Sequence, residues 1–354
     1  MPVTESGDAS QLSRVPQAGL AQMLADTIPD SLAASAWNLI VGAQRILILA
    51  HEHPDPDALG SALGLALALE SRGSTCFVAC ADPVPATYAF LPQHDRVISA
   101  LPEEPCDLVI ALDAGELSRY GNLYTRYQDY FDQATILNID HHVTSAGCGA
   151  VNVIDSHAAA TAEILTVLLL NRQVTITRQV AQCLMAGIVT DTRAFEYDAT
   201  TSRTLLAGAY LLGCGAMPYE IIKPVYRMKP LAKARLWARI IEQTLQTAAD
   251  GRIVWVVLRQ SFLKELAATP DMDDGLPGHL MDIEGVAVAA VLKEQEDGST
   301  RVSLRTTEPF DAAAIASTFG GGGHVRAAGC SIELRPDDAI DVLIPVLERA
   351  VDRR

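Results

Sequence analysis

The order of the first secondary structure elements follows from residues 45–71, which read RILILAHEHPDPDALGSALGLALALES. The apolar run at 46–50 is typical of a buried strand, and residues 58–71 have the small and apolar composition of a buried helix. Gly73 follows that helix as a stop signal. The stretch therefore predicts a strand, a polar loop and a helix, which is how a βαβ unit begins.

The same alternation continues along the chain. Further strands are expected at 75–80, 108–112, 136–139 and 151–154, and helices at 161–171, 177–190 and 200–212. A second set contains strands at 252–258, 286–292, 300–305 and 329–333, with helices at 261–267, 311–318 and 337–350. We predict an α/β fold, with a mostly parallel sheet in an N-terminal domain and a smaller α/β domain after it.

The predicted boundaries divide the chain into four parts. Between Glu220 and Arg239, six basic residues and two prolines accompany one acid, a change of character that favours a linker. We expect a mobile lead at 1–30, the first domain at 31–215, a linker running into a helix at 216–240, and the second domain at 241–354.

Charge and composition exclude some classes of function. The chain has 354 residues, 49% of them hydrophobic, which suits a globular protein of about two domains. Its net charge of −16 argues against broad electrostatic binding of long DNA or RNA. Residues 1–200 hold 9 Arg and no Lys against 23 acids, so nearly all of the excess lies there. Those acids form either a solvated surface or a cation site, and only the motifs can decide.

Cysteine usage and hydropathy indicate the compartment. The seven cysteines form no CxxC pair and several lie in apolar runs, which fits a reducing environment. The N-terminus lacks the basic and apolar regions of a signal peptide, and no apolar stretch reaches the roughly 18–20 residues that a membrane helix needs. We expect a cytoplasmic protein without a membrane partner.

Carboxylates and imidazoles gather directly after the predicted strands. Because the carboxyl ends of parallel strands meet at one edge of a sheet, these groups should meet as well, and without a cation they would repel each other. Carboxylates with a minority of imidazoles suit divalent ions such as Mn²⁺, and two such ions clamp a phosphoryl group and lower the pKa of a bridging water. The groups are His51, Asp55 and Asp57 after the first strand, Asp113 after the strand at 108–112, Asp140, His141 and His142 after the strand at 136–139, and Asp191 at the end of the helix at 177–190.

A run of four glycines, Gly320–Gly323, precedes His324 near the C-terminus. Such a run is costly unless the backbone must approach something closely, and successive exposed N–H groups make an anion nest. A flexible hinge is the alternative, but the adjoining histidine favours a ligand site. Arg305 ends a predicted strand. It could bind a phosphate through two parallel hydrogen bonds, or it could be an ordinary surface charge.

Together these motifs resemble those of the DHH-family phosphoesterases. HxxPDxD at 51–57, the single Asp113, DHH at 140–142 and Asp191 stand in the family order. GGGH at 321–324 with AAG at 327–329 resembles the signature of the associated DHHA1 domain. The resemblance covers residues 40–350 and is greatest to the stand-alone NrnA-type oligoribonucleases (nanoRNases), which are also 3′-phosphoadenosine 5′-phosphate phosphatases.

The resemblance implies two divalent cations, with Mn²⁺ favoured and Mg²⁺ or Co²⁺ as alternatives. It places the active site in a cleft between the two domains, with His142 and Asp113 as catalytic residues and Asp140 orienting His141. One ion would be held by His51, Asp55 and Asp113, and the other by Asp57, Asp113, His141 and Asp191. The substrate would be bound by Arg305, Gly321, Gly322, Gly323 and His324.

The implied activity is hydrolysis of di- to pentanucleotides to mononucleotides, and of 3′-phosphoadenosine 5′-phosphate to AMP. The partners would be short single-stranded RNA or DNA and small nucleotides, with no long duplex. A cyclic-di-AMP or linear dinucleotide (pApA or pGpG) phosphodiesterase is the nearest alternative, because the same site could serve it. A family II inorganic pyrophosphatase lacks the GGGH signature, and a degenerate nucleotide-binding regulator would have lost a metal ligand. Substrate length, cleavage direction, RNA or DNA preference and a homodimeric state stay open.

Four further residues belong to no motif role. Arg193 stands where family members often have glycine, and it could contact substrate or pair with Glu196. Glu163 matches a frequent family position but is interpreted as structural. His53 and His157 are interpreted as bystanders.

Overall fold

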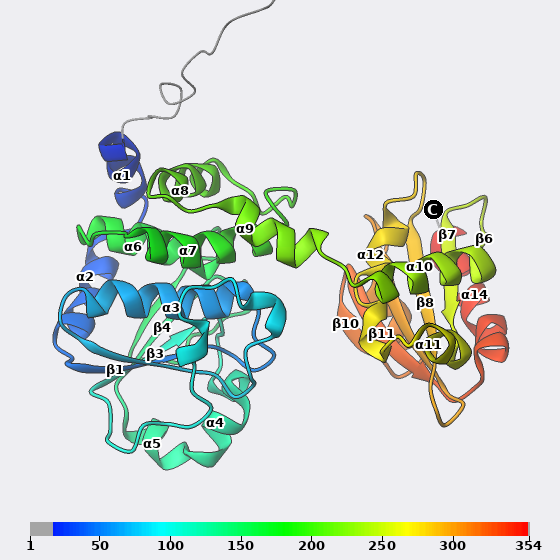
Figure 1. Cartoon of the computed structure of the whole chain (residues 1–354), viewed down its shortest axis with the longest axis horizontal. Coiled ribbons are helices and arrows are strands. Elements are labelled where there is room, and N and C mark those ends of the chain that lie inside the picture. Colours follow the sequence, from blue (N-terminus) through cyan, green and yellow to red (C-terminus); the bar gives the residue numbers. More distant parts are fainter. Residues whose placement is uncertain (1–16, 353–354) are drawn as a thin grey trace, which may run out of the picture. The chain divides into compact units, whose positions relative to one another are not determined.

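The computed structural model describes residues 17–352 and divides into two compact units. The division falls between Met228 and Lys229, inside the predicted linker region 216–240. Figure 1 follows the chain by colour from the N-terminal unit to the C-terminal unit. Each unit contains its own sheet and its own buried apolar clusters.

A five-stranded parallel sheet forms the centre of the N-terminal unit. Its spatial order is β2-β1-β3-β4-β5, which confirms the predicted parallel α/β architecture. β1 pairs with β2 on one side and β3 on the other, so the strand order reverses at β1 and β3. Open α/β sheets bind ligands at this reversal point, beyond the carboxyl ends of the strands. The strands are β1 (Arg45–Leu49), β2 (Thr75–Ala79), β3 (Leu108–Leu112), β4 (Ile136–Asp140) and β5 (Val151–Ile154).

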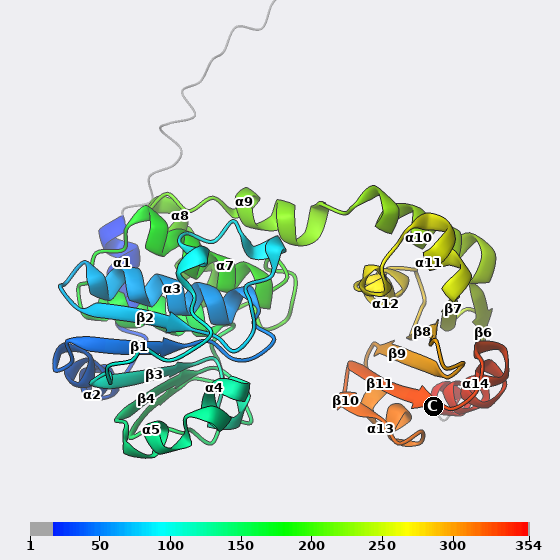
Figure 2. The same cartoon turned by 60° about the horizontal axis from the view of Figure 1, so that its bottom comes forward.

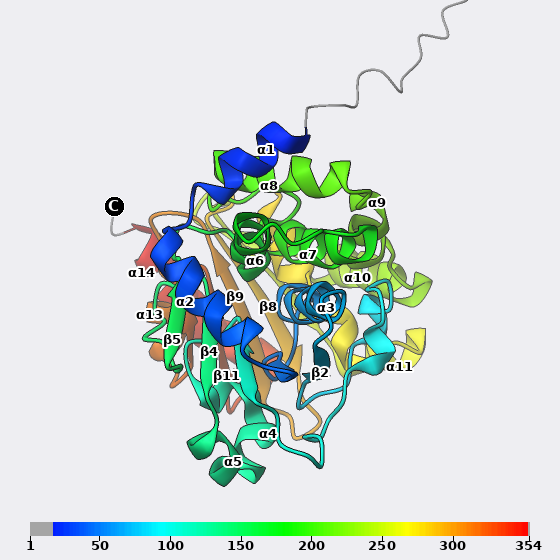
Figure 3. The same cartoon turned by 90° about the vertical axis from the view of Figure 1, so that its left-hand side faces the viewer.

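Helices cover both faces of this sheet, as Figures 1 and 3 show. Alternate strand residues explain the arrangement, because Ile46 and Ile48 of β1 face one cluster while Leu47 and Leu49 face the other. The larger cluster packs against α2 (Asp30–Val41), α3 (Pro56–Glu70), α6 (Thr161–Asn171), α7 (Arg178–Asp191) and α8 (Ser202–Gly213). The smaller cluster packs against α4 (Gly121–Arg126) and α5 (Gln128–Gln133).

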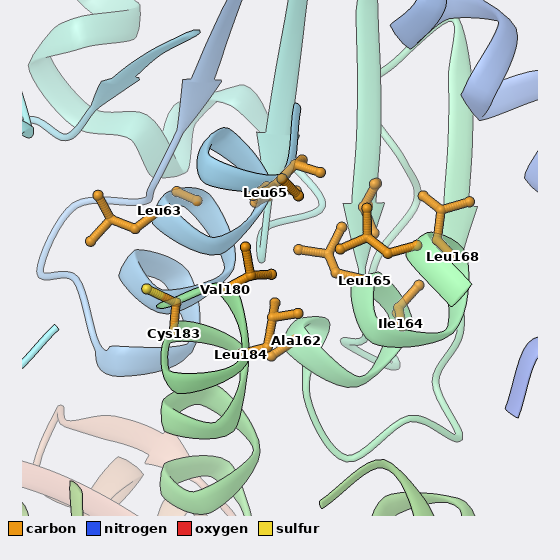
Figure 4. Packing of buried hydrophobic residues seen from close by; sticks show 14 of the residues in the cluster. Leu63, Leu65, Ala162, Ile164, Leu165, Leu168, Val180, Cys183 and Leu184 are labelled. Carbon is orange, nitrogen blue, oxygen red and sulfur yellow. The ribbon is translucent and has the colours of Figure 1, made fainter. Parts of the chain in front are cut away.

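α3 is buried along nearly its whole length and packs directly on α7. Two glycines on α3 permit this approach, since a Cβ at Gly60 would lie 2.4 Å from the carbonyl oxygen of Cys183. A Cβ at Gly64 would lie 3.2 Å from the side chain of Leu184. Figure 4 labels Cys183 and Leu184 of α7 and Leu63 of α3 among the buried side chains of this cluster. The close packing brings the ends of α3 and α7 together at the edge of the sheet.

A helix occupies part of the predicted mobile lead. α1 (Gln17–Ala25) buries Leu20 and Leu24 and contacts α6 and α8. The prediction for residues 1–16 lies outside the described residues. Within residues 17–352 no single helix is long and apolar enough to span a membrane; α8 and residues 218–227 reach that length together only as a pair bent by 105°.

The C-terminal unit contains a six-stranded mixed sheet in the order β10-β11-β9-β8-β7-β6. Only β7 and β8 pair in parallel. Figure 2 shows α13 (Ala312–Ser317) and α14 (Pro336–Asp352) on one face, and α10 (Leu231–Thr244), α11 (Gln260–Leu266) and α12 (Leu276–Met281) on the other. The strands are β6 (Gln246–Ala248), β7 (Ile253–Leu258), β8 (Val288–Glu294), β9 (Thr300–Thr306), β10 (Gly322–His324) and β11 (Ala327–Ile332).

The predicted longer elements are all present, with ends shifted by a few residues at most. The helices α1 and α2, of 9 and 12 residues, were not predicted from the sequence. The other unpredicted elements are short, because a few residues contain too little of a period to be recognised. They include α4, α5, α12, β6 and β10. The remaining short elements are η1 (Ala86–Tyr88), η2 (His94–Arg96), η3 (Leu117–Tyr120), α9 (Pro218–Ile222), the π-helical turn η4 (Lys223–Arg227) and η5 (Pro270–Asp273).

Candidate metal centre

The carboxylates and imidazoles predicted to meet do lie together, beyond the carboxyl ends of β1, β3 and β4. Three groups of three residues each have one ligand atom per residue within 4.8 Å of the others in the same group. Asp113 belongs to two of the groups and His141 to two, so the groups form one continuous cluster. The groups are His51, Asp55 and Asp113; Asp57, His141 and Asp191; and Asp113, His141 and His142.

The loop between β1 and α3 positions two carboxylates in different ways. Asp55 is the N-cap of α3, and its Oδ1 accepts the backbone N–H groups of Asp57 and Ala58 at 2.9 Å each. Asp57 is fully buried, and its carboxylate accepts the backbone N–H groups of Thr161 and Ala162 at 2.7 and 3.0 Å. Asp57 therefore lies at the positive N-terminal end of α6, which stabilises its charge.

Asp113 occupies the middle of the cluster and is 2% exposed. Its φ of +58° is uncommon outside glycine, although aspartate tolerates that region better than most residues. Its Oδ1 accepts a hydrogen bond from the hydroxyl of Thr161 at 2.9 Å, and its backbone N–H donates to the carbonyl of Ile139 at 3.0 Å. α6 thus holds the carboxylate of Asp113, while β4 holds its backbone.

The orientation of His51 leaves one nitrogen for a cation. Nδ1 lies 2.8 Å from the carbonyl oxygen of Glu52, a contact that places its proton there. In the neutral ring Nε2 then presents a lone pair toward Oδ2 of Asp113 at 3.4 Å and Oδ2 of Asp55 at 3.9 Å. Several electron-pair donors directed at one point match the requirement of a bound cation.

His141 repeats this arrangement on the other side of Asp113. Its Nδ1 lies 3.3 Å from the carbonyl oxygen of Ala158. Its Nε2 lies 3.4 Å from Oδ1 of Asp113 and 3.3 Å from Oδ2 of Asp191. Asp113 therefore has one oxygen toward each imidazole, as a carboxylate between two ions requires.

Burial and mutual repulsion both shift the pKa values of these carboxyls. Burial, followed by the charges of Asp113 and Asp55, raises the pKa of Asp57 well above its usual value. Burial, followed by the charges of Asp57 and Asp113, does the same to the pKa of Asp191. Burial also acts to raise the pKa of Asp113, but the neighbouring imidazoles of His51, His141 and His142 outweigh it and lower that pKa. Divalent cations would relieve this repulsion, so the donor set fits them.

The resemblance implied that Asp140 orients the ring of His141. In the structure it holds the ring of His142 instead. Its Oδ1 accepts a hydrogen bond from Nδ1 of His142 at 2.7 Å, whereas it contacts His141 only through the backbone N–H, at 2.8 Å. The reason is geometric, because the ring of His141 is already held by the carbonyl of Ala158. Asp140 is fully buried and the side chain of His142 is 49% exposed.

Four residues had no motif role in the sequence, and their contacts in the structure are as follows. Glu163 is fully buried, pairs with Nε of Arg203 at 2.5 Å and lies outside the cluster, as a structural residue would. The ring of His53 is 88% exposed on the side chain and contacts Asp82. His157 is exposed, with its backbone N–H donating to Asp155. Arg193 pairs with Glu196 at 3.2 Å.

Three residues that support the site were missed in the sequence. Thr161 holds both Asp57 and Asp113, but a threonine at a helix start is typical of an ordinary cap. Asn138 donates from Nδ2 to the carbonyls on both sides of Asp113, at Ala111 and Ala114. A polar residue in an otherwise apolar strand was its available signal. Gly187 of α7 also went unnoticed.

Gly187 brings α7 to the carboxylate of Asp57. A Cβ on Gly187 would lie 2.1 Å from Oδ1 of Asp57 and 2.7 Å from the Cβ of Ala162. Only glycine leaves room for that carboxylate between α7 and the beginning of α6. A glycine within a helix gave no indication of this contact before the fold was known.

The glycine run in the C-terminal unit has a structural role that differs from the predicted anion nest. Residues 322–324 form the edge strand β10, which pairs antiparallel with β11. A Cβ on Gly321 would lie 2.2 Å from the carbonyl oxygen of Gly329, and one on Gly323 would lie 2.6 Å from that of Ala327. These two glycines permit the close approach of β10 to β11, whereas Gly322 has open space around it.

Arg305 and His324 lie in one row across this sheet. His324 pairs with Ala327, and Ala327 pairs with Arg305, so the three side chains share a face. His324 is exposed and Arg305 is half-buried, with its Nη1 donating to the carbonyl of Leu304. The backbones of Arg305 and His324 are two strand spacings apart, about 10 Å, and only the methyl group of Ala327 lies between their side chains. The C-terminal unit therefore brings together its predicted substrate residues by itself.

Comparisons with known proteins agree with these motifs. Residues 45–188 match the DHH family, N-terminal domain, and residues 255–352 match the DHHA1 domain. The chain is similar to the bifunctional oligoribonuclease and PAP phosphatase NrnA of Thermus thermophilus, with 32% identity over 87% of this chain and 90% of that protein. A probable bifunctional oligoribonuclease and PAP phosphatase NrnA of Streptococcus mutans is 31% identical over 81% and 89%. In structure, an exopolyphosphatase-related protein from Bacteroides fragilis superposes with a TM-score of 0.82 at 21% identity, covering 91% of this chain and 97% of that one.

Proposed function

The chain belongs to the DHH/DHHA1 family of metal-dependent phosphoesterases, and from this we propose that it hydrolyses short oligonucleotides and 3′-phosphoadenosine 5′-phosphate. The observation that carries the proposal is the complete set of candidate ligands around Asp113, combined with a C-terminal unit that presents Arg305 and His324 on one face. The similarity to NrnA proteins over most of both chains supports the substrate class.

We propose that the ligand groups hold two divalent ions, both Mn²⁺. When bound, such ions polarise a phosphoryl group and lower the pKa of water. One would be held by His51, Asp55 and Asp113, and the other by Asp57, Asp113, His141 and Asp191. The backbone N–H groups at the start of α6 fix Asp57, and carbonyl oxygens fix the rings of His51 and His141, so the ligands are oriented in advance.

His142 is suited to protonate the leaving oxygen. Its hydrogen bond to Asp140 raises the pKa of the imidazole, because the carboxylate stabilises the protonated ring. Nδ1 is occupied by the carboxylate, which leaves Nε2 as the nitrogen that can deliver a proton. The half-exposed ring can reach a substrate, whereas the buried carboxylate beneath it cannot.

We propose that the C-terminal unit holds the terminal phosphate of the substrate. A guanidinium can grip a phosphate with two parallel hydrogen bonds, and Arg305 has no acidic partner within residues 17–352. His324 supplies a second donor in the same row. The predicted cleft between the two units stays a prediction. The seven cysteines are all free thiols, in keeping with the proposed cytoplasmic location.

The test is a substrate panel. Purified protein is incubated with 5′-phosphorylated di- to pentanucleotides, 3′-phosphoadenosine 5′-phosphate, cyclic-di-AMP and pyrophosphate, each with Mn²⁺ and with a chelator. We expect mononucleotides from the oligonucleotides and AMP from the bisphosphate, both abolished by the chelator. Phosphate release from pyrophosphate alone, or turnover of cyclic-di-AMP alone, would overturn the proposal.

A further inference from the structure

On one half of the C-terminal sheet, α12 contacts β9, whereas α10, α11 and α12 make no extensive contact with β11 or β10; we call the open part of this surface the uncovered half-face. α10, α11 and α12 pack on the side of the sheet to which Val254 and Val256 of β7 and Ala289 and Val291 of β8 point. On β9 the same side is made by Arg301, Ser303 and Arg305, none of which is fully buried. The opposite face is covered along its width by α13 and α14, as Figure 2 shows.

Small residues line this uncovered half-face beside β9. In register with Arg305, Ser303 and Arg301, the neighbouring strand β11 presents Ala327, Gly329 and Ser331. Beyond it, β10 adds Gly322 and His324. The small side chains of alanine, glycine and serine leave space above β11. An extended ligand could therefore lie along β11, between the larger side chains of β9 and β10.

The two arginines of β9 have no ion-pair partner among residues 17–352. The strands of this sheet carry a third cationic side chain, Lys293, which is in register with Arg301 on β8. Lys293 is neutralised by Asp273 at 2.9 Å. Arg301 has no such contact, and Arg305 donates only to a backbone carbonyl. The exposed cationic charge on this half-face is therefore available to an anion.

Spacing decides what kind of anion fits. Four strand residues separate the two Cα atoms by about 13 Å, and strand side chains stand roughly perpendicular to the sheet. Arg301 and Arg305 therefore suit two different phosphates of one molecule better than a single phosphate. Mononucleotide-sized ligands would engage the Arg305 end alone.

We propose that the uncovered half-face is a track for the sugar-phosphate backbone of a single-stranded oligonucleotide. Arg305 and His324 receive the terminal phosphate, and Arg301 contacts a phosphate farther along the chain. The proposal rests on the proposed function and deepens it, because it assigns the residue that makes affinity depend on oligonucleotide length. The positive charge of the arginines and the small side chains of β11 favour a single-stranded oligonucleotide as the occupant.

Binding and hydrolysis are measured separately to test this track. The metal-loaded enzyme and its Arg301→Gln variant are titrated with 5′-phosphorylated tetranucleotide and dinucleotide, both with hydrolysis-resistant phosphorothioate linkages and a 3′ fluorophore. We expect the variant to weaken tetranucleotide binding about tenfold, and by at least about fivefold more than dinucleotide binding. The salt dependence of log Kd for the tetranucleotide should lose about 0.7 of its slope, as expected for one phosphate contact.

Arg349→Gln is the matched control, since it removes the same charge from an exposed position on α14, on the other side of the sheet. It should change neither affinity. Equal losses in Arg301→Gln and Arg349→Gln, or equal losses for the two lengths, would overturn the track. If the wild-type enzyme hydrolysed no natural oligonucleotide, the proposed function would fail, while the binding titration would still decide the role of Arg301.

Discussion

Oδ1 of Asp140 accepts a hydrogen bond from Nδ1 of His142 at 2.7 Å, and the same oxygen accepts the backbone N–H groups of His141 and His142. The carboxylate is fully buried, whereas the imidazole reaches solvent. A buried anion behind a half-exposed ring fixes the tautomer and supports the protonated state, which is what a proton donor at the edge of a metal cluster requires.

We predict that Asp140→Asn lowers kcat about 100-fold and changes KM less than about threefold, because the variant loses proton delivery and keeps the substrate contacts. The measurement is steady-state hydrolysis of a 5′-phosphorylated dinucleotide. Asp82→Asn is the matched control, since Asp82 accepts from Nδ1 of His53 at 2.8 Å in the same geometry but far more exposed and outside the cluster.

The control should retain wild-type kcat. A loss confined to KM in Asp140→Asn, or an equal loss of kcat in the two variants, would contradict the assigned role of Asp140.

Asp191→Asn should separate metal binding from folding. In the absence of metal this variant is expected to unfold at the same temperature as the wild type or a few degrees higher, because it removes one carboxylate that Asp57 and Asp113 repel. With Mn²⁺ at about 100 times its Kd, the wild type should gain about 3 kcal/mol of stability, and the variant should gain much less. Thermal unfolding with and without Mn²⁺ measures both effects.

Asp198→Asn is the control for this experiment, because it removes an exposed acid from the same region of the chain. It should retain the full response to Mn²⁺. An undiminished Mn²⁺ response in Asp191→Asn would remove that residue from the ligand set.

Residues next to strand ends were predictable because strand order and chain position are enough to bring them together. β1, β3 and β4 are short apolar runs, and the groups that follow them meet at one sheet edge whatever the details of packing. The supporting residues were not predictable in this way. The contact of Gly187 with Asp57 depends on the distance between two helices, which no local pattern records.

The partner of Asp140 could not be predicted from the sequence either. Its position in the sequence is compatible with holding either of the two histidines that follow it. The choice depends on Ala158, a residue distant in sequence whose carbonyl already holds His141. The glycine run likewise predicted a close approach, but the approaching group is strand β11 of the chain itself.

Arg305→Gln should mainly weaken substrate binding. The guanidinium is the proposed phosphate contact and lies outside the metal cluster, so its loss should raise KM about 10-fold to 100-fold and lower kcat less than about threefold. Initial rates at varied concentrations of 3′-phosphoadenosine 5′-phosphate measure the change. Arg326→Gln is the control, since Arg326 is already paired with Glu308 at 2.9 Å. A fall in kcat without a rise in KM would contradict the assignment.

Glu163→Gln should cost stability and leave metal affinity intact. Glu163 is fully buried, and its carboxylate holds Arg203 at 2.5 Å and the hydroxyl of Thr204 at 2.7 Å. The variant loses one of the two ion pairs of Arg203, which keeps its pair with Asp155 at 2.7 Å, so the cost should be about 1–3 kcal/mol. Urea unfolding measures the loss, and isothermal titration with Mn²⁺ measures the affinity. A weakened Mn²⁺ affinity at unchanged stability would instead make Glu163 part of the metal site.

The glycine run allows the structural and binding roles of its members to be distinguished. Gly321→Ala places a Cβ 2.2 Å from the carbonyl oxygen of Gly329, a backbone atom that cannot move aside without disturbing the pairing of β9 with β11, so the variant should lose about 1–3 kcal/mol of stability. Gly322→Ala meets nothing within 4 Å and should unfold like the wild type. Because Gly322 lies on the proposed substrate face, its methyl group should raise the KM for oligonucleotides. Urea unfolding is followed by the fluorescence of the three tryptophans, of which Trp237 and Trp255 lie in the C-terminal unit and Trp37 in the N-terminal unit. Equal stability of the two variants would show that β10 does not approach β11 as closely as described.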